Sequence, residues 1–170
     1  LPKDLRATMH LAKQRDVELP MLAGILPSNR LHVERALDKV LATGKRRVGI
    51  IGLSFKTGTD DLRESPLVTL AEQLIGKGLS LLVYDPEVHL SRLLGANKRF
   101  IEQHLPHIGN LLRADIGQVA AASDVLVVGL TDKDVLAALR TNVRDTHTII
   151  DLANIPDATT WPCAVDGLCW

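Results

Sequence analysis

The sequence contains few aromatic residues and few cysteines, and it has no long hydrophobic run. Aromatic side chains make up 3% of its 170 residues, and the two cysteines are Cys163 and Cys169. Two cysteines are too few for a disulfide framework and favour a reducing compartment, so we expect a cytoplasmic protein. No apolar segment approaches the roughly 20 residues that span a bilayer, so we expect no membrane partner.

The sequence also lacks net charge. Twenty Lys and Arg residues balance twenty Asp and Glu residues. A neutral chain generates no field that would attract nucleic acid, so any anion site has to be assembled locally. The six histidines and two cysteines do not follow a zinc-binding pattern, so we expect no metal. Residues 1–20 carry charge throughout and lack the apolar core of a signal peptide.

Enough apolar residues are present for one hydrophobic core, since 46% of the chain is hydrophobic. Residues 1–44 show helical periodicity only, whereas residues 45–170 alternate short apolar runs with amphipathic segments. Apolar strands separated by amphipathic helices are typical of a parallel sheet that is covered on both faces. The predicted fold is therefore α/β: a Rossmann-like, doubly wound parallel sheet preceded by a helical connector.

The connector is predicted from its caps and breaking residues. We expect one helix from Asp4, as N-cap, to about residue 15, and a second helix from Ser28 to Gly44. The segment between them contains three helix-breaking residues, Pro20, Gly24 and Pro27.

In the α/β part, we expect four strands, at 48–53, 79–84, 125–130 and 148–151. The expected helices begin with one that Ser65 caps and that ends at "GKG" (76–78), because Ser-Pro suits a first helical turn. Further helices are expected around 87–104, near 115–122 and near 132–140, with "PHIGNLL" (106–112) as a loop.

The loop after the first strand is the candidate site, because open parallel sheets bind ligands at the carboxyl ends of their strands. The dinucleotide fingerprint G-x-G-x-x-G is absent there: Gly49 and Gly52 are three residues apart, and the loop is several residues longer. Instead, "SFKTGTDDLRES" (54–65) carries Lys56 and Arg63, which could neutralise phosphates through their side chains. Asp85 ends the second strand, where an acidic residue often binds ribose hydroxyls.

Structural interpretations of these residues remain open. Asp60, Asp61 and Glu64 could favour the N-terminus of the following helix, and Arg63 could pair with one of them. Asp85 could be a turn residue.

Several stretches carry a family resemblance. "GLSFKTGTDDLRESP" (52–66), followed by "LAEQLIGKG" (70–78) and "VYDP" (83–86), resembles the C-terminal domain of the UDP-glucose/GDP-mannose dehydrogenase family of nucleotide-sugar 6-dehydrogenases. "LPKD" (1–4) resembles the segment that directly follows the catalytic cysteine of that family. The two signatures occur in the order and at roughly the distance that the family shows.

The resemblance implies an organisation and a chemistry. Residues 1–44 would be the end of a central helical dimerisation region, and residues 45–170 a nucleotide-sugar-binding domain. The family oxidises the C6 alcohol of the sugar to a carboxylate by two hydride transfers to NAD, through a cysteine thioester. NAD would be bound mainly by a domain absent from this chain. Neither Cys163 nor Cys169 matches the nucleophile, so the chain alone would be inactive.

The resemblance also assigns roles to five residues. Asp4 matches a catalytic aspartate that positions water near the nucleophile, and Lys3 lies beside it at the substrate. Phe55 and Lys56 match a pair that contacts the nucleotide sugar. Arg63 matches an arginine that reaches NAD, so the charged loop would face anions from two ligands.

The substrate is implied by finer similarities. "TGTDD", "LRESPLV" and "GLCW" are similar to the GDP-mannose branch of the family that serves alginate synthesis, more than to the UDP-glucose branch. They imply GDP-mannose as the substrate and a homodimer or higher homo-oligomer as the assembly. Two alternatives stay open: a UDP-glucose 6-dehydrogenase fragment, and a non-catalytic nucleotide-binding or oligomerisation module.

Overall fold

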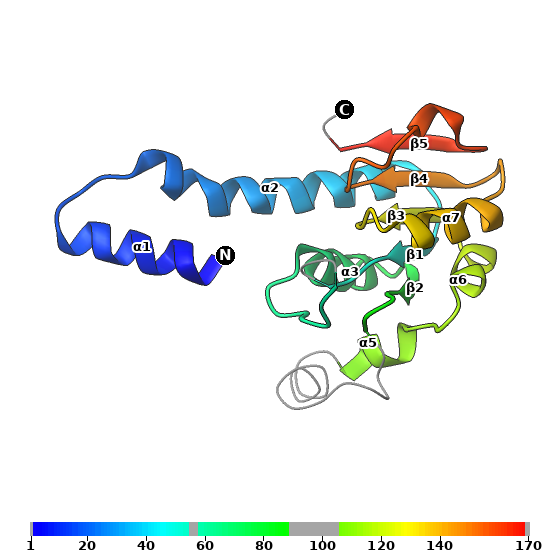
Figure 1. Ribbon diagram of the computed structural model, residues 1–170, viewed down its shortest axis with the longest axis horizontal. Coiled ribbons are helices and arrows are strands. Elements are labelled where there is room, and N and C mark those ends of the chain that lie inside the picture. The colour runs from blue at the N-terminus through cyan, green and yellow to red at the C-terminus, as the bar shows by residue number, and fades with distance from the viewer. Residues whose placement is uncertain (1, 55–57, 89–105, 169–170) are drawn as a thin grey trace.

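The computed structural model describes residues 2–54, 58–88 and 106–168, and of residues 106–108 only the backbone. Its centre is a five-stranded sheet in the order β2-β1-β3-β4-β5, in which every pairing is parallel (Figure 1). The strands are β1 (Arg47–Ile51), β2 (Ser80–Tyr84), β3 (Val125–Val128), β4 (Thr148–Asp151) and β5 (Ala164–Gly167). The strand order reverses between β1 and β3, so the prediction of a Rossmann-like α/β fold is confirmed.

Helices cover both faces of the sheet. On one face, α3 (Pro66–Gly76) and the second half of α2 (Pro20–Ala42) enclose one apolar cluster, in which Val40, Ile50 and Leu74 are fully buried. On the other face, α6 (Ile116–Ala122) and α7 (Lys133–Asn142) enclose a second cluster. The sheet is therefore buried on both sides, which explains why its strands are continuously apolar.

Two glycines, Gly49 within β1 and Gly52 just after it, have structural roles. A Cβ on Gly49 would lie 2.7 Å from Val119 Cγ1 and 2.9 Å from Leu126 Cδ2, so glycine is what lets α6 approach the sheet closely. Gly52 has a φ of +90°, which side-chain-bearing residues rarely adopt, and it turns the chain out of the strand. Neither glycine forms part of an open phosphate-binding loop.

The connector differs from its prediction. Helix α1 spans Pro2–Gln14, so Asp4 lies within the first turn and is not the N-cap. Helix α2 runs through Gly24 and Pro27, so the helix start predicted at Ser28 is wrong. An interior proline costs one hydrogen bond and about 3 kcal/mol. A break at this point would instead leave four C=O groups at one new helix end and four N–H groups at the other.

Three further predictions are corrected. Helix α5 (Pro106–Leu111) occupies the segment expected to be a loop, and the prediction omitted both β5 and a short 3₁₀ helix, η1 (Ala158–Thr160). Strands β1 and β3 end two residues before the predicted positions. Most of the helix expected around 87–104 lies outside the described residues.

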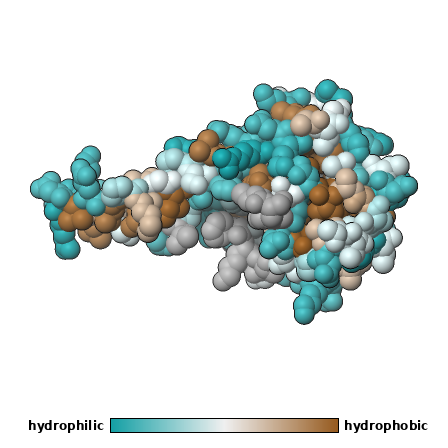
Figure 2. Space-filling model, turned by 90° about the horizontal axis from the view of Figure 1, so that it is seen from above, coloured by the Kyte–Doolittle hydropathy of each residue, from teal (hydrophilic) through white to brown (hydrophobic). Residues whose placement is uncertain are grey.

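Helices α1 and α2 run antiparallel and form an arm that extends away from the sheet (Figures 1 and 2). Apolar side chains gather on this arm, and Met21, with 82% of its surface exposed, is the extreme case. The others are exposed by about half: Leu11, Val17 and Leu31. In the part of the chain that the structure describes, no helix is long and apolar enough to cross a membrane.

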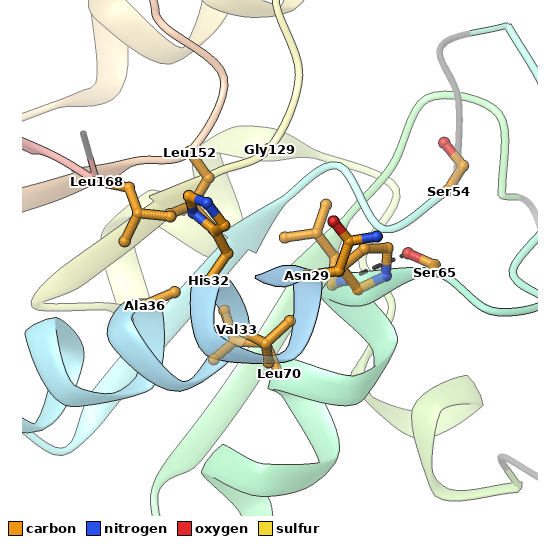
Figure 3. Close-up of a pocket in the computed structure, with 12 residues that line it drawn as sticks. Asn29, His32, Val33, Ala36, Ser54, Ser65, Leu70, Gly129, Leu152 and Leu168 are labelled. Carbon is orange, nitrogen blue, oxygen red and sulfur yellow. Dashed lines mark hydrogen bonds between the residues drawn. The ribbon is translucent and has the colours of Figure 1, made fainter. Parts of the chain in front are cut away.

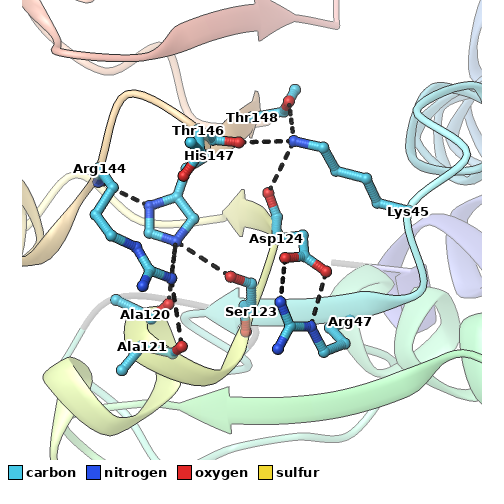
Figure 4. Close-up of polar contacts among 10 residues, drawn as sticks. All are labelled: Lys45, Arg47, Ala120, Ala121, Ser123, Asp124, Arg144, Thr146, His147 and Thr148. Carbon is cyan, nitrogen blue, oxygen red and sulfur yellow. Dashed lines mark hydrogen bonds and ion pairs between the residues drawn. The ribbon is translucent and has the colours of Figure 1, made fainter.

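A polar network holds the amino ends of the strands together (Figure 4). Arg47 at the start of β1 forms a two-pronged ion pair with Asp124, which precedes β3. Lys45 Nζ donates hydrogen bonds to the Thr146 carbonyl at 2.8 Å and to Thr148 Oγ1 at 3.1 Å. The charged side chains of Lys45, Arg47 and Asp124 at this edge of the sheet therefore bond to other groups of the protein.

His147 is the buried titratable group of this network, with 2% of its surface exposed. Its Nδ1 accepts a hydrogen bond from the Arg144 backbone at 2.8 Å, and Nε2 lies 3.1 Å from the Ala120 and Ser123 carbonyls. This geometry fits a neutral ring that is protonated on Nε2. Burial lowers the pKa of His147, and the positive charge of Arg144 lowers it further.

Because the pKa of His147 is lower in the folded state than its usual 6.5, stability should depend on pH. The unfolded chain binds the proton first, so the contribution of the neutral ring is complete above about pH 6.5 and falls as the pH drops below that value. Urea unfolding from pH 7.5 to 5 should show this loss, at no more than about 1.4 kcal/mol per pH unit. His147→Asn should have a flatter profile than the wild type between pH 6.5 and 5, while His10→Asn on the exposed face of α1 serves as the control. An equally steep profile for His147→Asn would contradict this assignment.

Candidate functional site

The candidate site begins where the chain leaves β1, and Asp85 fixes this point. One Asp85 oxygen accepts hydrogen bonds from the backbone N–H groups of Leu53 at 2.6 Å and Ser54 at 2.8 Å. Its other oxygen accepts from Glu87 at 2.9 Å and Val88 at 3.2 Å. The carboxylate is 2% exposed, and its two oxygens receive four N–H donors. The end of β2 therefore holds the first residues of the loop that follows β1.

Ser65 closes the other end of the same loop. Its Oγ donates a hydrogen bond of 2.7 Å to the Leu53 carbonyl and accepts one of 3.3 Å from the Leu67 N–H. Ser65 therefore joins the two ends of the loop and caps α3 at once. Leu62, within the loop, is 2% exposed and belongs to the core. The loop from 54 to 65 is thus fixed at both ends and at Leu62.

Among the described residues of this loop, Arg63 pairs with Asp61 and Glu64 pairs with α1. Arg63 Nε and Nη2 donate to the two oxygens of Asp61 at 2.8 and 2.7 Å. Arg6 of α1 donates from Nη1 to Glu64 Oε1 at 2.6 Å, and its Nη2 contacts the same oxygen. The Arg63 guanidinium lowers the pKa of Asp61, and the charge of Lys3 adds a smaller contribution. The start of α1 therefore lies beside the charged loop.

The N-terminus of α3 does not offer a standard phosphate site. Pro66 has no N–H, and the N–H of Leu67 already bonds to Ser65. A dinucleotide-binding helix needs free N–H groups at this position. Pro66 and Leu67 therefore offer no free N–H group to a diphosphate, which agrees with the absence of the glycine fingerprint.

A cavity of about 370 Å³ opens beside the loop (Figure 3). Its walls come from the carboxyl ends of four strands, through Ser54 after β1, Gly129 after β3, Leu152 after β4 and Leu168 after β5. Helix α2 closes it with Asn29 and His32. The cavity therefore lies at the point where the strand order reverses, which is where open α/β sheets bind ligands.

A second cavity, of about 490 Å³, lies between α1, α2 and α3. It shares Asn29, Val33 and Pro66 with the first cavity, and its far wall includes Pro2 and Arg6 of α1. The two cavities are therefore adjacent, and together they run from the edge of the sheet to the first turn of α1.

The structure brings three of the five predicted site residues into this region. Lys3 and Asp4 lie in the first turn of α1, and Arg63 lies in the charged loop, where it pairs with Asp61. Phe55 and Lys56 lie outside the described residues, between Ser54 on the cavity wall and Gly58.

Two other candidates, Asp85 and Cys163, do not take part in ligand binding or catalysis by the contacts that the structure describes. The turn interpretation of Asp85 holds, because its buried carboxylate is occupied by backbone N–H groups and is not available to a ribose. Cys163 is half-buried, and burial raises the pKa of its thiol, which disfavours a nucleophilic thiolate. Cys169 lies outside the described residues.

Three residues of the region were not predicted. Arg6 reaches Glu64 across 58 positions, and no local pattern indicates such a pair. Asn29 and His32 line the first cavity from α2. They were missed because the second helix was expected to begin at Ser28, and no local pattern in the sequence indicates a cavity beside it.

Comparisons with known proteins agree with this geometry. Residues 49–158 match the model of the UDP-glucose/GDP-mannose dehydrogenase family, UDP binding domain. GDP-mannose 6-dehydrogenase of Pseudomonas aeruginosa is 46% identical over 170 residues, which is all of this chain and 38% of that protein. A UDP-glucose 6-dehydrogenase of Rickettsia bellii is 27% identical over 164 residues, or 91% of this chain and 35% of that protein.

The structural comparison gives the same relationship. The crystal structure of a ternary complex of GDP-mannose dehydrogenase from Pseudomonas aeruginosa superposes with a TM-score of 0.88 at 46% identity. The match covers all of this chain and 38% of the chain in that structure. This chain therefore spans well under half the length of the relatives that it matches.

The role assigned to Asp85 predicts a loss of stability in Asp85→Asn. The substitution keeps the side-chain volume but turns one acceptor oxygen into an NH₂ donor, which then faces backbone N–H groups in a buried position. We expect a loss of about 1–3 kcal/mol in the free energy of unfolding. Urea denaturation measures this change, and the exposed Asp145→Asn should stay within about 0.5 kcal/mol of the wild type. Equal stabilities of the two variants would contradict the role of Asp85.

Proposed function

Because the chain belongs to the UDP-glucose/GDP-mannose dehydrogenase family, we propose that it binds a nucleotide sugar at the carboxyl ends of β1 and β3. The observation that carries this proposal is the cavity of about 370 Å³ at the strand-order reversal, bordered by Ser54 of the charged loop. In this proposal, residues 1–44 are the end of a helical dimerisation region and residues 45–170 are the nucleotide-sugar domain.

In this proposal, an uncharged part of the ligand binds in the first cavity and the diphosphate binds at the charged loop. Among the residues that the structure describes, those that line the first cavity include no lysine or arginine, and most are apolar. It therefore suits an uncharged part of the ligand. The diphosphate would lie against the charged loop, because the N-terminus of α3 is closed to it. Lys56, by resemblance, is the cation that contacts it, and it follows Ser54 by two positions.

The proposed reaction is the NAD-dependent oxidation of GDP-mannose to GDP-mannuronate by the protein to which this segment belongs. Greater identity to the GDP-mannose enzymes than to the Rickettsia bellii UDP-glucose enzyme, 46% against 27%, supports GDP-mannose over UDP-glucose. The product would serve an acidic exopolysaccharide such as alginate.

The proposed roles of the described residues are those that the family resemblance implies. Asp4, in the first turn of α1, would orient the attacking water and accept its proton, and Lys3 would bind the substrate beside it. NAD, when bound, would be the hydride acceptor. Arg63, whose side chain is 55% exposed, is the described residue of the loop that would contact NAD. Most of the NAD contacts would come from outside this chain, since α3 offers no free N-terminus to a diphosphate.

The helical arm would form the contact between two copies. Exposed apolar side chains on a helix are typical of protein interfaces, and Met21 and Val17 lie together at the turn between α1 and α2. We propose a homodimer, or a higher homo-oligomer, that buries this part of the arm.

Calorimetric titration of the chain with GDP-mannose, UDP-glucose and NAD tests the ligand. We expect GDP-mannose to bind more tightly than UDP-glucose, and NAD not to bind to the isolated chain. Lys56→Ala should weaken GDP-mannose binding by about tenfold, since a hydrogen bond to a charged group contributes about 1.5–3 kcal/mol. Lys77→Ala, at the opposite end of α3, is the matched control. NAD binding alone would overturn the proposal, and unchanged affinity in Lys56→Ala would remove Lys56 from the site.

Light scattering coupled to size-exclusion chromatography tests the assembly. We expect the wild-type chain to run as a dimer or larger, and Met21→Lys to shift it to the monomer, because the substitution puts a charge into an apolar contact. Lys13→Glu, on the exposed surface of α1, should keep the wild-type mass. A monomeric wild-type chain at high concentration would contradict an interface on the arm.

A further inference from the structure

We propose that Arg6 and Glu64 form a latch that fixes the first turn of α1 to the charged loop, so that Lys3 and Asp4 on the helix and Arg63 on the loop face one ligand. The latch is the ion pair between the Arg6 guanidinium and the Glu64 carboxylate. Both are positioning residues that act through their neighbours. The inference rests on the proposed function for the identity of the ligand, but the mechanical link itself does not depend on it.

The geometry of the pair supports a positioning role. Both terminal nitrogens of Arg6 contact Glu64 Oε1, one of them at 2.6 Å. The two residues are 58 positions apart and belong to different elements. Arg6 is one turn of helix from Lys3, and Glu64 directly follows Arg63 in the chain. The pair therefore connects the two groups of predicted functional residues through short stretches of backbone.

Glu64 adopts an unusual backbone conformation. Its φ is +58°, in the left-handed region that disfavours residues with a β-carbon. Such conformations cost on the order of 1 kcal/mol or more and persist only where the surroundings impose them. Here the next residue, Ser65, is fixed by the Leu53 carbonyl, and the Glu64 side chain is turned toward Arg6. The strained backbone thus directs the carboxylate at α1.

Apolar packing at this end of α1 is sparse. The second cavity separates α1 from α3, with Arg6 and Glu64 among its lining residues. In α1, only Leu5 and Ala12 are buried, and only Leu5 lies at this end. Because one buried side chain and a cavity adjoin the first turn of α1, polar contacts such as the latch should contribute to its position.

The effect of the latch should be local, because both of its side chains are partly exposed. An ion pair with side chains 54% and 42% exposed contributes little to global stability. Its effect should therefore be local, on the distance between the first turn of α1 and the loop. The pair would change how often this side of the cavity opens, while the sheet remains unaffected.

Hydrogen–deuterium exchange of the 170-residue chain tests the link. We expect Arg6→Gln and Glu64→Gln each to raise amide exchange in both the first turn of α1 and residues 58–65, by up to about fivefold. The charge swap, Arg6→Glu with Glu64→Arg, should return exchange in both segments toward the wild-type rate. Arg15→Gln removes a positive charge beyond the far end of α1 and is the matched control.

Glu64→Gly distinguishes the effect of the backbone strain from that of the carboxylate. Glycine tolerates a φ of +58° but cannot pair with Arg6. We expect it to loosen the first turn of α1 as much as Glu64→Gln does. Unchanged exchange in α1 in both Glu64 variants would overturn the latch, as would an effect confined to the segment that carries the substitution.

Ligand affinity provides the readout that a purely structural pair would not move. Titration with GDP-mannose should show weaker binding in both single variants, by threefold or more, with recovery in the charge swap. Affinity equal to the wild type in both single variants would overturn the positioning role. If the wild-type chain binds neither GDP-mannose nor UDP-glucose, the proposed function fails, and the exchange data still decide whether the latch exists.

Discussion

The candidate site depends on the hydrogen bonds that the buried Asp85 carboxylate accepts from the backbone of Leu53 and Ser54. These bonds connect the residues after β1 to the residue after β2. Ser65, at the end of the loop, bonds to the Leu53 carbonyl. A loop of this length would otherwise lose its fixed shape to conformational entropy. Because both ends are held, Asp61, Arg63 and Glu64 of the loop have defined positions near the cavities, and Arg6 extends the arrangement to α1.

Charged residues serve different ends at the two edges of the sheet. At the amino edge, Lys45 and the Arg47–Asp124 pair satisfy backbone groups and each other, and neutral His147 is enclosed by carbonyls. At the carboxyl edge, Arg63 and Glu64 lie at the surface, beside cavities large enough for a ligand. The second arrangement fits ligand binding because Glu64 lines the second cavity, whereas Lys45, Arg47, Asp124 and His147 line neither cavity.

Much of the fold could be predicted from the sequence. Continuous apolar runs identified four of the five strands, and Ser65-Pro66 identified the start of α3, because local chemistry decides both features. Strand β5 was missed since it lies at the edge of the sheet and forms no continuous apolar run. The continuity of α2 was missed because helix ends cost more than one interior proline. Within the site, the charged loop was identified from composition. The choice between a ribose ligand and a turn residue stayed open for Asp85, and Arg6 and Asn29 were missed, because the groups that they contact are distant in the sequence.

The central claim is that a nucleotide sugar binds at the carboxyl edge of the sheet, where β1 and β3 diverge. The most direct measurement is the change in backbone amide chemical shifts of the ¹⁵N-labelled chain during titration with GDP-mannose. The account predicts the largest changes at Ser54, Ser65 and Gly129, with Asp124 and Thr148 at the amino edge unchanged. Changes confined to the amino edge, or a spectrum that stays the same at saturating ligand, would contradict it.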